Sequence, residues 1–287
     1  MKKLSQFSFI DVHYHANPDL YERRHSALEA GRIYQKHQGA VVLKSHLGST
    51  AVQATLAQAE GLPVLPSVTL NDIAGGIDYR VVLNSLSNYK PHIESRMIVH
   101  LPTLTGRTHN SKLSRQLINP QHADFTLKSL TISDEKGRIK NEVLDLFRLS
   151  SDEPIVISTG HASKAEVYAL IDLAGQYPQS RLMLNQPANP LTGLSATELL
   201  ALSGALPHLY IEQTFLTYAL GYQSWEDFSS VLMHHPSALY SSDLGQPSQI
   251  DLVEHFDLSL RYFEQLKLPL DRITRICQTN AQKMLNL

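Results

Sequence analysis

The sequence has little that would place it among disulfide-rich, membrane or nucleic-acid-binding proteins. Its single cysteine, Cys277, excludes an intramolecular disulfide, and its first residues lack the apolar run of a secretory signal, so we expect a reducing cytoplasm. A formal net charge of -2 and a sequence pI near 6.7 give no basis for binding nucleic acid or a membrane surface. A hydrophobic share of 43% across 287 residues is enough to bury a large core, which favours a globular enzyme or a small-molecule-binding protein.

Eight short apolar runs of strand length recur along the chain, and most are separated by stretches with helical spacing. The runs cover residues 9–12, 40–43, 64–68, 97–99, 155–157, 182–184, 209–211 and 238–240. Most are continuous instead of alternating, as expected for parallel strands that are covered on both faces. We therefore predict an α/β fold, a (β/α)8 TIM barrel, regular or distorted, in a single domain over residues 1–287.

Residues 101–138 break this rhythm, because they form a long stretch between the fourth and fifth predicted strands. Residues 125–137 have the pattern of a β-hairpin whose turn lies at residues 134–137. We expect an insert that passes over the mouth of the barrel, where Arg107 and His109 could contact substrate. The alternative is that both are ordinary solvated loop residues.

The first apolar run ends in two histidines, His13 and His15. Alternation along a strand points both imidazoles to the same side of the chain, where two nitrogen donors converge. Imidazole is a good ligand for zinc, and Asp11, in the same phase, could orient the strand end or a ligating ring from behind. Such a pair also occurs by chance at ordinary strand ends, so it needs further ligands.

Further ligands follow the fifth and eighth runs, as His161 and Asp243. Residues that follow the strands of a TIM barrel gather at one face, so these side chains should meet the first pair around a divalent ion. Zinc is our first expectation, with one or two ions bound. Gln246, just after Asp243, is a weaker candidate for substrate contact. The alternatives are a histidine bonded near a helix start and a carboxylate that serves as a turn residue.

The second run ends in Lys44 and His46, which share a face by alternation. A lysine that ends an apolar strand is costly to bury unless another group uses its amine. Either residue could bind metal or hold substrate, and a carbamylated Lys44 could bridge two ions. His100 occupies the matching place on the fourth strand, where a structural histidine is the alternative.

With these residues the chain resembles the amidohydrolase superfamily, distorted (β/α)8 barrels that hold one or two divalent metals. The likeness is carried by the histidine pair after the first strand, by His161 after the fifth and by Asp243 after the eighth. The last residues, 273–287, are similar to the C-terminal helix of that group, and parts of the chain resemble an uncharacterised bacterial subfamily. The sixth strand departs from the pattern, since Asn185 and Gln186 stand where relatives usually have a histidine. We treat these two amides as candidate substrate contacts.

The resemblance implies a metal-dependent hydrolase that acts on an amide, ester or lactone carbonyl of a small molecule. Asp243 would move the proton, while Lys44, His46 or His100 would polarise the electrophile. A phosphoesterase in the same barrel and a non-catalytic metal- or ligand-binding barrel are the alternatives. A small-molecule substrate is the expected partner, and a homo-oligomer is compatible with the sequence.

Overall fold

The computed structural model describes residues 2–3, 8–107, 112–113, 115–122 and 127–285. Nine of its strands surround one axis: β2 (Phe9–Tyr14), β3 (Gly39–Leu43), β4 (Val64–Leu65), β5 (Ser67–Thr69), β7 (Met97–His100), β8 (Ile155–Ser158), β9 (Leu182–Leu184), β10 (Leu209–Thr214) and β11 (Ala238–Ser241). Each of the eight apolar runs coincides with this set, and the third run is divided into β4 and β5. Pro66 lies between these two, and a proline cannot donate a ladder hydrogen bond.

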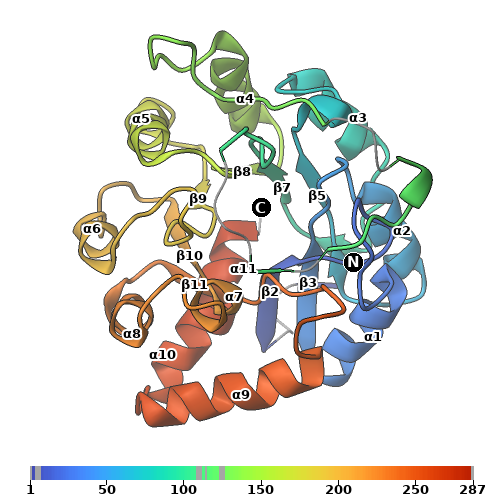
Figure 1. Cartoon of the computed structure of the whole chain (residues 1–287), viewed down its shortest axis with the longest axis vertical. Helices are drawn as coiled ribbons and strands as arrows, with labels where there is room; N and C mark the ends of the chain where they lie inside the picture. The colour runs from blue at the N-terminus through green and yellow to red at the C-terminus, as the bar shows by residue number, and fades with distance from the viewer. Residues whose placement is uncertain (1, 4–7, 108–111, 114, 123–126, 286–287) are drawn as a thin grey trace.

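Every pairing in this set is parallel. One sheet has the order β11-β10-β9-β8-β7-β5, and the other has the order β2-β3-β4. The two sheets meet where β11 approaches β2, through an isolated parallel bridge between Tyr14 and Leu244. Figure 1 shows the strands as a ring with helices outside it. The predicted α/β fold of parallel strands is confirmed.

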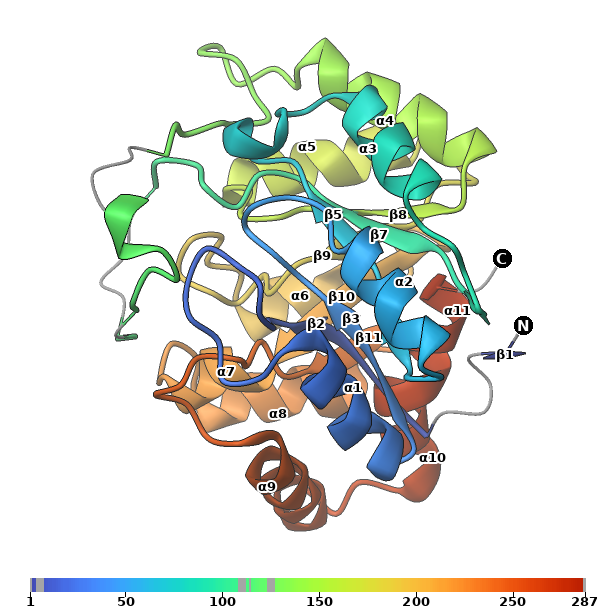
Figure 2. The same cartoon turned by 90° about the vertical axis from the view of Figure 1, so that its right-hand side faces the viewer.

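Helices follow the strands in sequence, with two helices between β10 and β11 and three after β11. They are α1 (Ala27–Lys36), α2 (Ala51–Ala59), α3 (Tyr79–Ser87), α4 (Asn141–Asp152), α5 (Lys164–Ala174), α6 (Ala196–Ala201), α7 (Phe215–Ala219), α8 (Trp225–His234), α9 (Leu252–Gln265), α10 (Leu270–Thr274) and α11 (Asn280–Leu285). Short helical turns occur at Asp72–Ala74, Pro120–His122 and Arg275–Thr279. Two further strands, β1 (Lys2–Lys3) and β6 (Ile93–Glu94), pair with each other beside α11 (Figure 2).

Burial on both faces explains why the strand runs are continuously apolar. Alternate side chains such as Val41 and Leu43 belong to the cluster that packs against the helices. Their neighbours Ala40 and Val42 belong to a second cluster, which also contains Met284 of α11. Helix α11 therefore closes the barrel interior at the amino ends of the strands, which leaves the carboxyl ends for a site.

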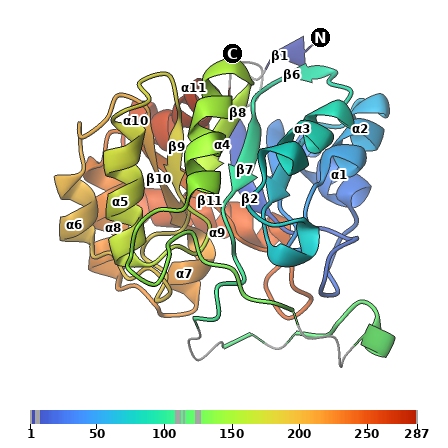
Figure 3. The same cartoon turned by 90° about the horizontal axis from the view of Figure 1, so that it is seen from above.

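The described parts of the insert between β7 and α4 lie at that carboxyl end, as Figure 3 shows. Its turn lies where the sequence predicts it, since the Gly137 amide donates to the Asp134 carbonyl at 2.9 Å. The pairing around this turn is an isolated antiparallel bridge between Ser133 and Ile139. Residues 127–140 contain this turn and bridge but no pair of hairpin strands. The first two residues of the predicted hairpin lie outside the described residues. Among the helices described, none has the length and apolar character needed to cross a bilayer.

Candidate metal centre

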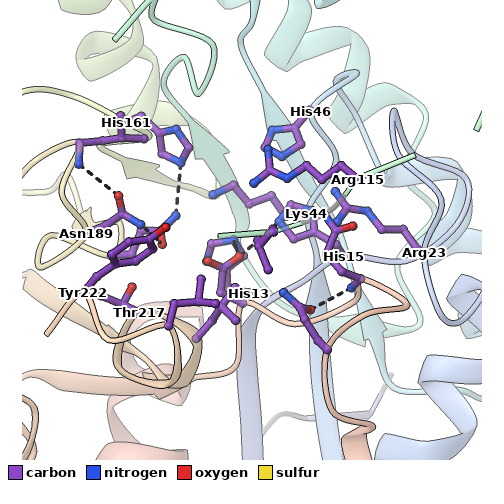
Figure 4. A pocket seen from close by; sticks show the side chains of 18 residues that line it. His13, His15, Arg23, Lys44, His46, Arg115, His161, Asn189, Thr217 and Tyr222 are labelled. Atoms are coloured by element: carbon purple, nitrogen blue, oxygen red, sulfur yellow. Dashed lines mark hydrogen bonds and ion pairs between the residues drawn. The ribbon is translucent and has the colours of Figure 1, made fainter. Parts of the chain in front are cut away.

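A pocket that is open to solvent at its mouth lies at the carboxyl ends of the strands (Figure 4). Three of its lining side chains, His13, His15 and Asp243, each offer one ligand atom, and these atoms lie within 4.8 Å of one another. The Asp243 Oδ1 atom is 2.9 Å from His13 Nε2 and 3.4 Å from His15 Nε2. Ligands at about 2.0–2.2 Å from one zinc ion in a tetrahedron are about 3.3–3.6 Å apart. The spacing of Asp243 and His15 falls in this range, and that of Asp243 and His13 is a few tenths of an ångström shorter.

The backbone brings these three side chains together from the two ends of the sequence. Alternation turns His13 of β2 and His15, just after its end, into the pocket. The buried Asp11 accepts from the His13 amide at 3.0 Å and from the Ser242 amide at 3.1 Å. This carboxylate therefore holds the ends of β2 and β11 together, as the strand-orienting role predicts. Gly245 has φ +133°, and a Cβ there would lie 2.1 Å from the His15 carbonyl oxygen, so only glycine allows this close approach.

Glu212 of β10 fixes the orientation of the His13 ring. Its buried carboxylate accepts a hydrogen bond from His13 Nδ1 at 2.8 Å. It also accepts from the Ser241 hydroxyl and from the backbone amide of Gln186, both at 2.8 Å. A proton on Nδ1 leaves the Nε2 lone pair facing Asp243. Within the described part of the chain, His13 Nε2 is buried and makes no hydrogen bond, although Asp243 is so near. Since two lone pairs at 2.9 Å repel each other, a proton or a cation must lie between these atoms.

A second carboxylate lies behind His15. Asp19 Oδ2 is 3.5 Å from His15 Nδ1, an ion-pair distance longer than a normal hydrogen bond, which leaves Nε2 turned toward Asp243. The same carboxylate accepts from Arg23 Nε at 2.8 Å and from the Ser45 hydroxyl at 2.8 Å. Although burial alone would raise the pKa of Asp19, the adjacent His15 ring and the charge of Arg23 hold it well below its usual range.

The charges of the three-residue cluster are strongly coupled. Burial lowers the pKa of His13, but the carboxylates of Asp243 and Glu212 outweigh burial and the opposing charge of Lys44, and raise that pKa to about 9. Burial would raise the pKa of Asp243, yet the neighbouring imidazoles hold it well below its usual value. Without a metal the cluster therefore holds a proton on His13, and a cation would take the place of that proton.

Across the pocket, Lys44 and His161 have neutral partners. The buried Lys44 amine donates to Asn185 Oδ1 at 2.9 Å, and burial lowers its pKa. Gln186 Nε2 lies 3.2 Å from His161 Nε2, so the amide donates to the ring nitrogen that would otherwise bind metal. Burial and the charge of Lys44 lower the pKa of His161 to about 3. Asn185 and Gln186 therefore hold other pocket side chains, although Gln186 also lines the cavity.

His46 and His100 lie near the three-residue cluster but outside it. The His46 ring stacks on His15 with centroids 5.1 Å apart, and its Nδ1 lies 3.0 Å from the Thr103 hydroxyl. His100 Nδ1 lies 2.8 Å from the Ser158 hydroxyl, while its buried Nε2 makes no hydrogen bond among the described residues. The centroid of its ring is 6.3 Å from that of His13.

The candidate substrate contacts divide in the same way. Gln246 lines the pocket, and its buried Oε1 makes no hydrogen bond within the described ranges. Arg107 is instead held outside this pocket, where it donates to the His161 carbonyl at 2.6 Å and pairs with Glu166 at 3.1 Å. Its guanidinium thus braces the start of α5, and contact of Arg107 with substrate stays a prediction. His109 lies outside the described residues.

Asp19 and Glu212 are the supporting carboxylates of the site that sequence reasoning missed, and it also missed Arg23 and Arg115 of the pocket lining. Glu212 left a signal, because it is a charged residue inside an apolar strand, where burial is costly without a partner. The only sequence signal for Asp19 is its spacing of four residues from both His15 and Arg23. Outside a helix that spacing does not predict a contact.

The comparisons with known proteins agree with this fold. A family model described as a family of unknown function, DUF6282, matches residues 8–212. The chain belongs to this family. The matched segment holds the two β2 histidines and Glu212, whereas Asp243 lies beyond it. No curated protein matches the chain.

Among solved structures, the chain is similar to an uncharacterised TIM-barrel protein, Bb4693, from Bordetella bronchiseptica. The TM-score is 0.56 at 14% sequence identity, with 96% of this chain and 97% of that chain covered. At this identity the likeness shows the fold alone. The parallel α/β architecture is that of a TIM-barrel protein.

Proposed function

We propose that this chain is a metal-dependent hydrolase of the amidohydrolase type, a single barrel domain that acts on the carbonyl of a small amide, ester or lactone. The observation that carries the proposal is the convergence of His13 Nε2, His15 Nε2 and Asp243 Oδ1 at one point of the pocket. Three protein ligands leave a position open for water, which is typical of catalytic zinc sites. Structural zinc sites usually use four protein ligands instead.

The donor set supports zinc as the first choice of ion. Imidazole nitrogen suits zinc, iron and nickel, and a carboxylate oxygen completes such a set. The orphaned lone pair on His13 Nε2 and the carboxylates behind both rings are the arrangement that orients histidine ligands. When bound, such an ion lowers the pKa of water from 15.7 toward about 7.

The side chains around the cluster supply proton transfer and polarisation. Both short contacts of Asp243 are made by Oδ1, so Oδ2 is the oxygen that accepts a proton from water and returns it to the leaving group. The Lys44 amine has donors beyond the one given to Asn185, and it donates one to the substrate oxygen as negative charge develops there.

The direct test combines metal analysis with a substrate panel of amides, esters, lactones and phosphomonoesters. Zinc-loaded wild-type protein should hydrolyse a carbonyl substrate, and Asp243→Asn should lower that turnover by about 10²–10⁴-fold. Asp145→Asn is the matched control, because Asp145 is paired with Arg148 on the exposed face of α4. Turnover of phosphomonoesters alone would make the protein a phosphoesterase. Full metal loading without any turnover would make it a binding barrel.

A further inference from the structure

The charged side chains that line the pocket are unbalanced. Three of the described lining residues are lysine or arginine, namely Arg23, Lys44 and Arg115, and Asp243 is the one carboxylate among them. The positive charge of Arg23 is compensated by Asp19, with which it forms an ion pair at 2.5 Å. The negative charge of Asp243 is compensated by the imidazoles of His13 and His15 and, under the proposed function, by the metal ion. Lys44 and Arg115 remain as cations with no carboxylate bonded to them in the described part of the chain.

Lys44 contributes the deep positive charge. Its side chain is 1% exposed, and the hydrogen-bond acceptor described for its amine is the neutral amide oxygen of Asn185. An ammonium group has three donors, and burying a cation with a neutral partner is costly unless an anion compensates it. The carboxylates of Glu212, Asp243 and Asp19 act on Lys44 through space. Glu212 is itself bonded to the His13 ring, to the Ser241 hydroxyl and to the Gln186 backbone amide.

Arg115 contributes the outer positive charge, from the insert between β7 and α4. Its guanidinium lies 5.2 Å from the centre of the Tyr21 ring, and that ring packs edge-on against His46 at 6.3 Å. Figure 4 shows the Arg115 side chain reaching into the pocket beside His46. The stacking holds the planar fork in place, and that fork suits bidentate contact with a carboxylate or phosphate.

The opposite wall of the pocket is apolar. Leu191, Leu216 and Leu220 line it beside Thr217 and Tyr222. A ligand that fills this space would place a hydrocarbon part against the leucines and a charged part against the arginine.

We infer that the substrate is a small organic oxyanion, a carboxylate or a phosphate with an apolar body, and that Arg115 holds its charged group while Lys44 provides a favourable field. This inference rests on the proposed function, because it names the substrate class for the same pocket.

The test measures binding of matched probes to the zinc-loaded full chain by calorimetry. Hexanoate and hexanamide share an apolar body and differ in charge, and inorganic phosphate tests the other oxyanion. Wild-type protein should bind hexanoate or phosphate at least about tenfold more tightly than hexanamide, because charge-assisted bonds to arginine are strong. Arg115→Gln should remove about tenfold of this preference, and Arg115→Lys should keep part of it. Arg32→Gln, on an exposed ion pair with Glu60, is the matched control and should change nothing.

Equal binding of hexanoate and hexanamide would overturn the inference, as would a preference that survives Arg115→Gln, because the anion would then sit on the ion itself. Repeating the measurement on chelator-treated protein distinguishes binding of the anion to Arg115 from binding of the anion to the metal ion. An Arg115-dependent preference without any hydrolysis supports the substrate class and counts against the hydrolase. Hydrolysis without that preference supports the hydrolase and overturns the substrate class.

Discussion

The two halves of the pocket use similar residues for different purposes. On the side of β2 and β11, two imidazoles have their Nδ1 atoms directed at carboxylates, and their Nε2 atoms face a third carboxylate. On the side of β8 and β9, Gln186 hydrogen bonds to His161, and Asn185 hydrogen bonds to Lys44. The first half leaves lone pairs that need a cation, whereas in the second half the Nε2 atom of His161 and the side-chain oxygen of Asn185 already have hydrogen-bond partners.

This difference favours one ion over two. A second ion near His161 would have to break the bonds to Gln186 and Asn185, and each such bond contributes roughly 0.5–1.5 kcal/mol. An amide oxygen is also a weaker zinc ligand than imidazole. The amides of the sixth strand, where the amidohydrolase pattern has a histidine, therefore have a visible structural effect. They form hydrogen bonds with His161 and Lys44, which occupies groups that a second ion would need.

The same substitution made in each half should give the largest contrast. His13→Gln removes an imidazole whose Nε2 points at Asp243, so zinc affinity should fall by at least about a hundredfold. His161→Gln alters a ring that is already bonded to an amide, so affinity should stay within about threefold. Competition with a chromophoric chelator measures both. Equal losses of zinc affinity in the two variants would mean that the ion lies between the two halves of the pocket, and that the halves do not differ in metal binding.

Glu212→Gln should have the next largest effect. The carboxylate accepts three hydrogen bonds with its two oxygens, and an amide would turn a donor toward one of those partners. The His13 ring would lose its fixed orientation, and zinc affinity should fall about 10–100-fold. Glu60→Gln, at an exposed ion pair, is the control. An unchanged affinity would mean that Glu212 supports the fold alone.

Metal binding should release a proton. The pKa of His13 is raised from 6.5 to about 9, so in metal-free protein the ring is charged at pH 7 and must lose its proton to bind a cation. Affinity should therefore rise by up to about tenfold per pH unit until about pH 9 and then level off. Calorimetry at pH 7 in buffers of different ionisation enthalpy should show about one proton released per ion. Release that persists unchanged in His13→Gln would assign the proton elsewhere.

The sequence predicted those parts of the site that depend on local backbone geometry. Alternation along β2 placed both of its histidines on one face, and the position after the last strand placed Asp243 beside them. The direction of His161 could not be predicted this way, because Gly160 before it has φ +56° and turns the chain. A Cβ on Gly160 would lie 2.0 Å from the Leu101 carbonyl oxygen, so the turn depends on a neighbour 59 residues earlier.

The supporting carboxylates could not be predicted, for a related reason. Glu212 reaches His13 across 199 residues, and that contact depends on how β2 and β10 are placed on the two sides of β11. Asp19 reaches His15 through a loop that folds back on itself and is held by Arg23. Residue type shows that such groups need partners, but only the closed barrel shows which partners they have.

The smallest effect is expected at the rim, where two arginines of the insert can be compared. Arg107 pairs with Glu166, and its side chain is 30% exposed, so Arg107→Ala should lower the free energy of unfolding by less than about 1 kcal/mol. Glu166 keeps its bonds to Ser133 and Ser163, which limits the loss. Because Arg107 lies outside the main pocket, KM for an active substrate should change less than about twofold, whereas Arg115→Gln should raise it about tenfold. Urea unfolding and steady-state kinetics measure the two effects, and a large KM change in Arg107→Ala would bring that arginine back into the substrate site.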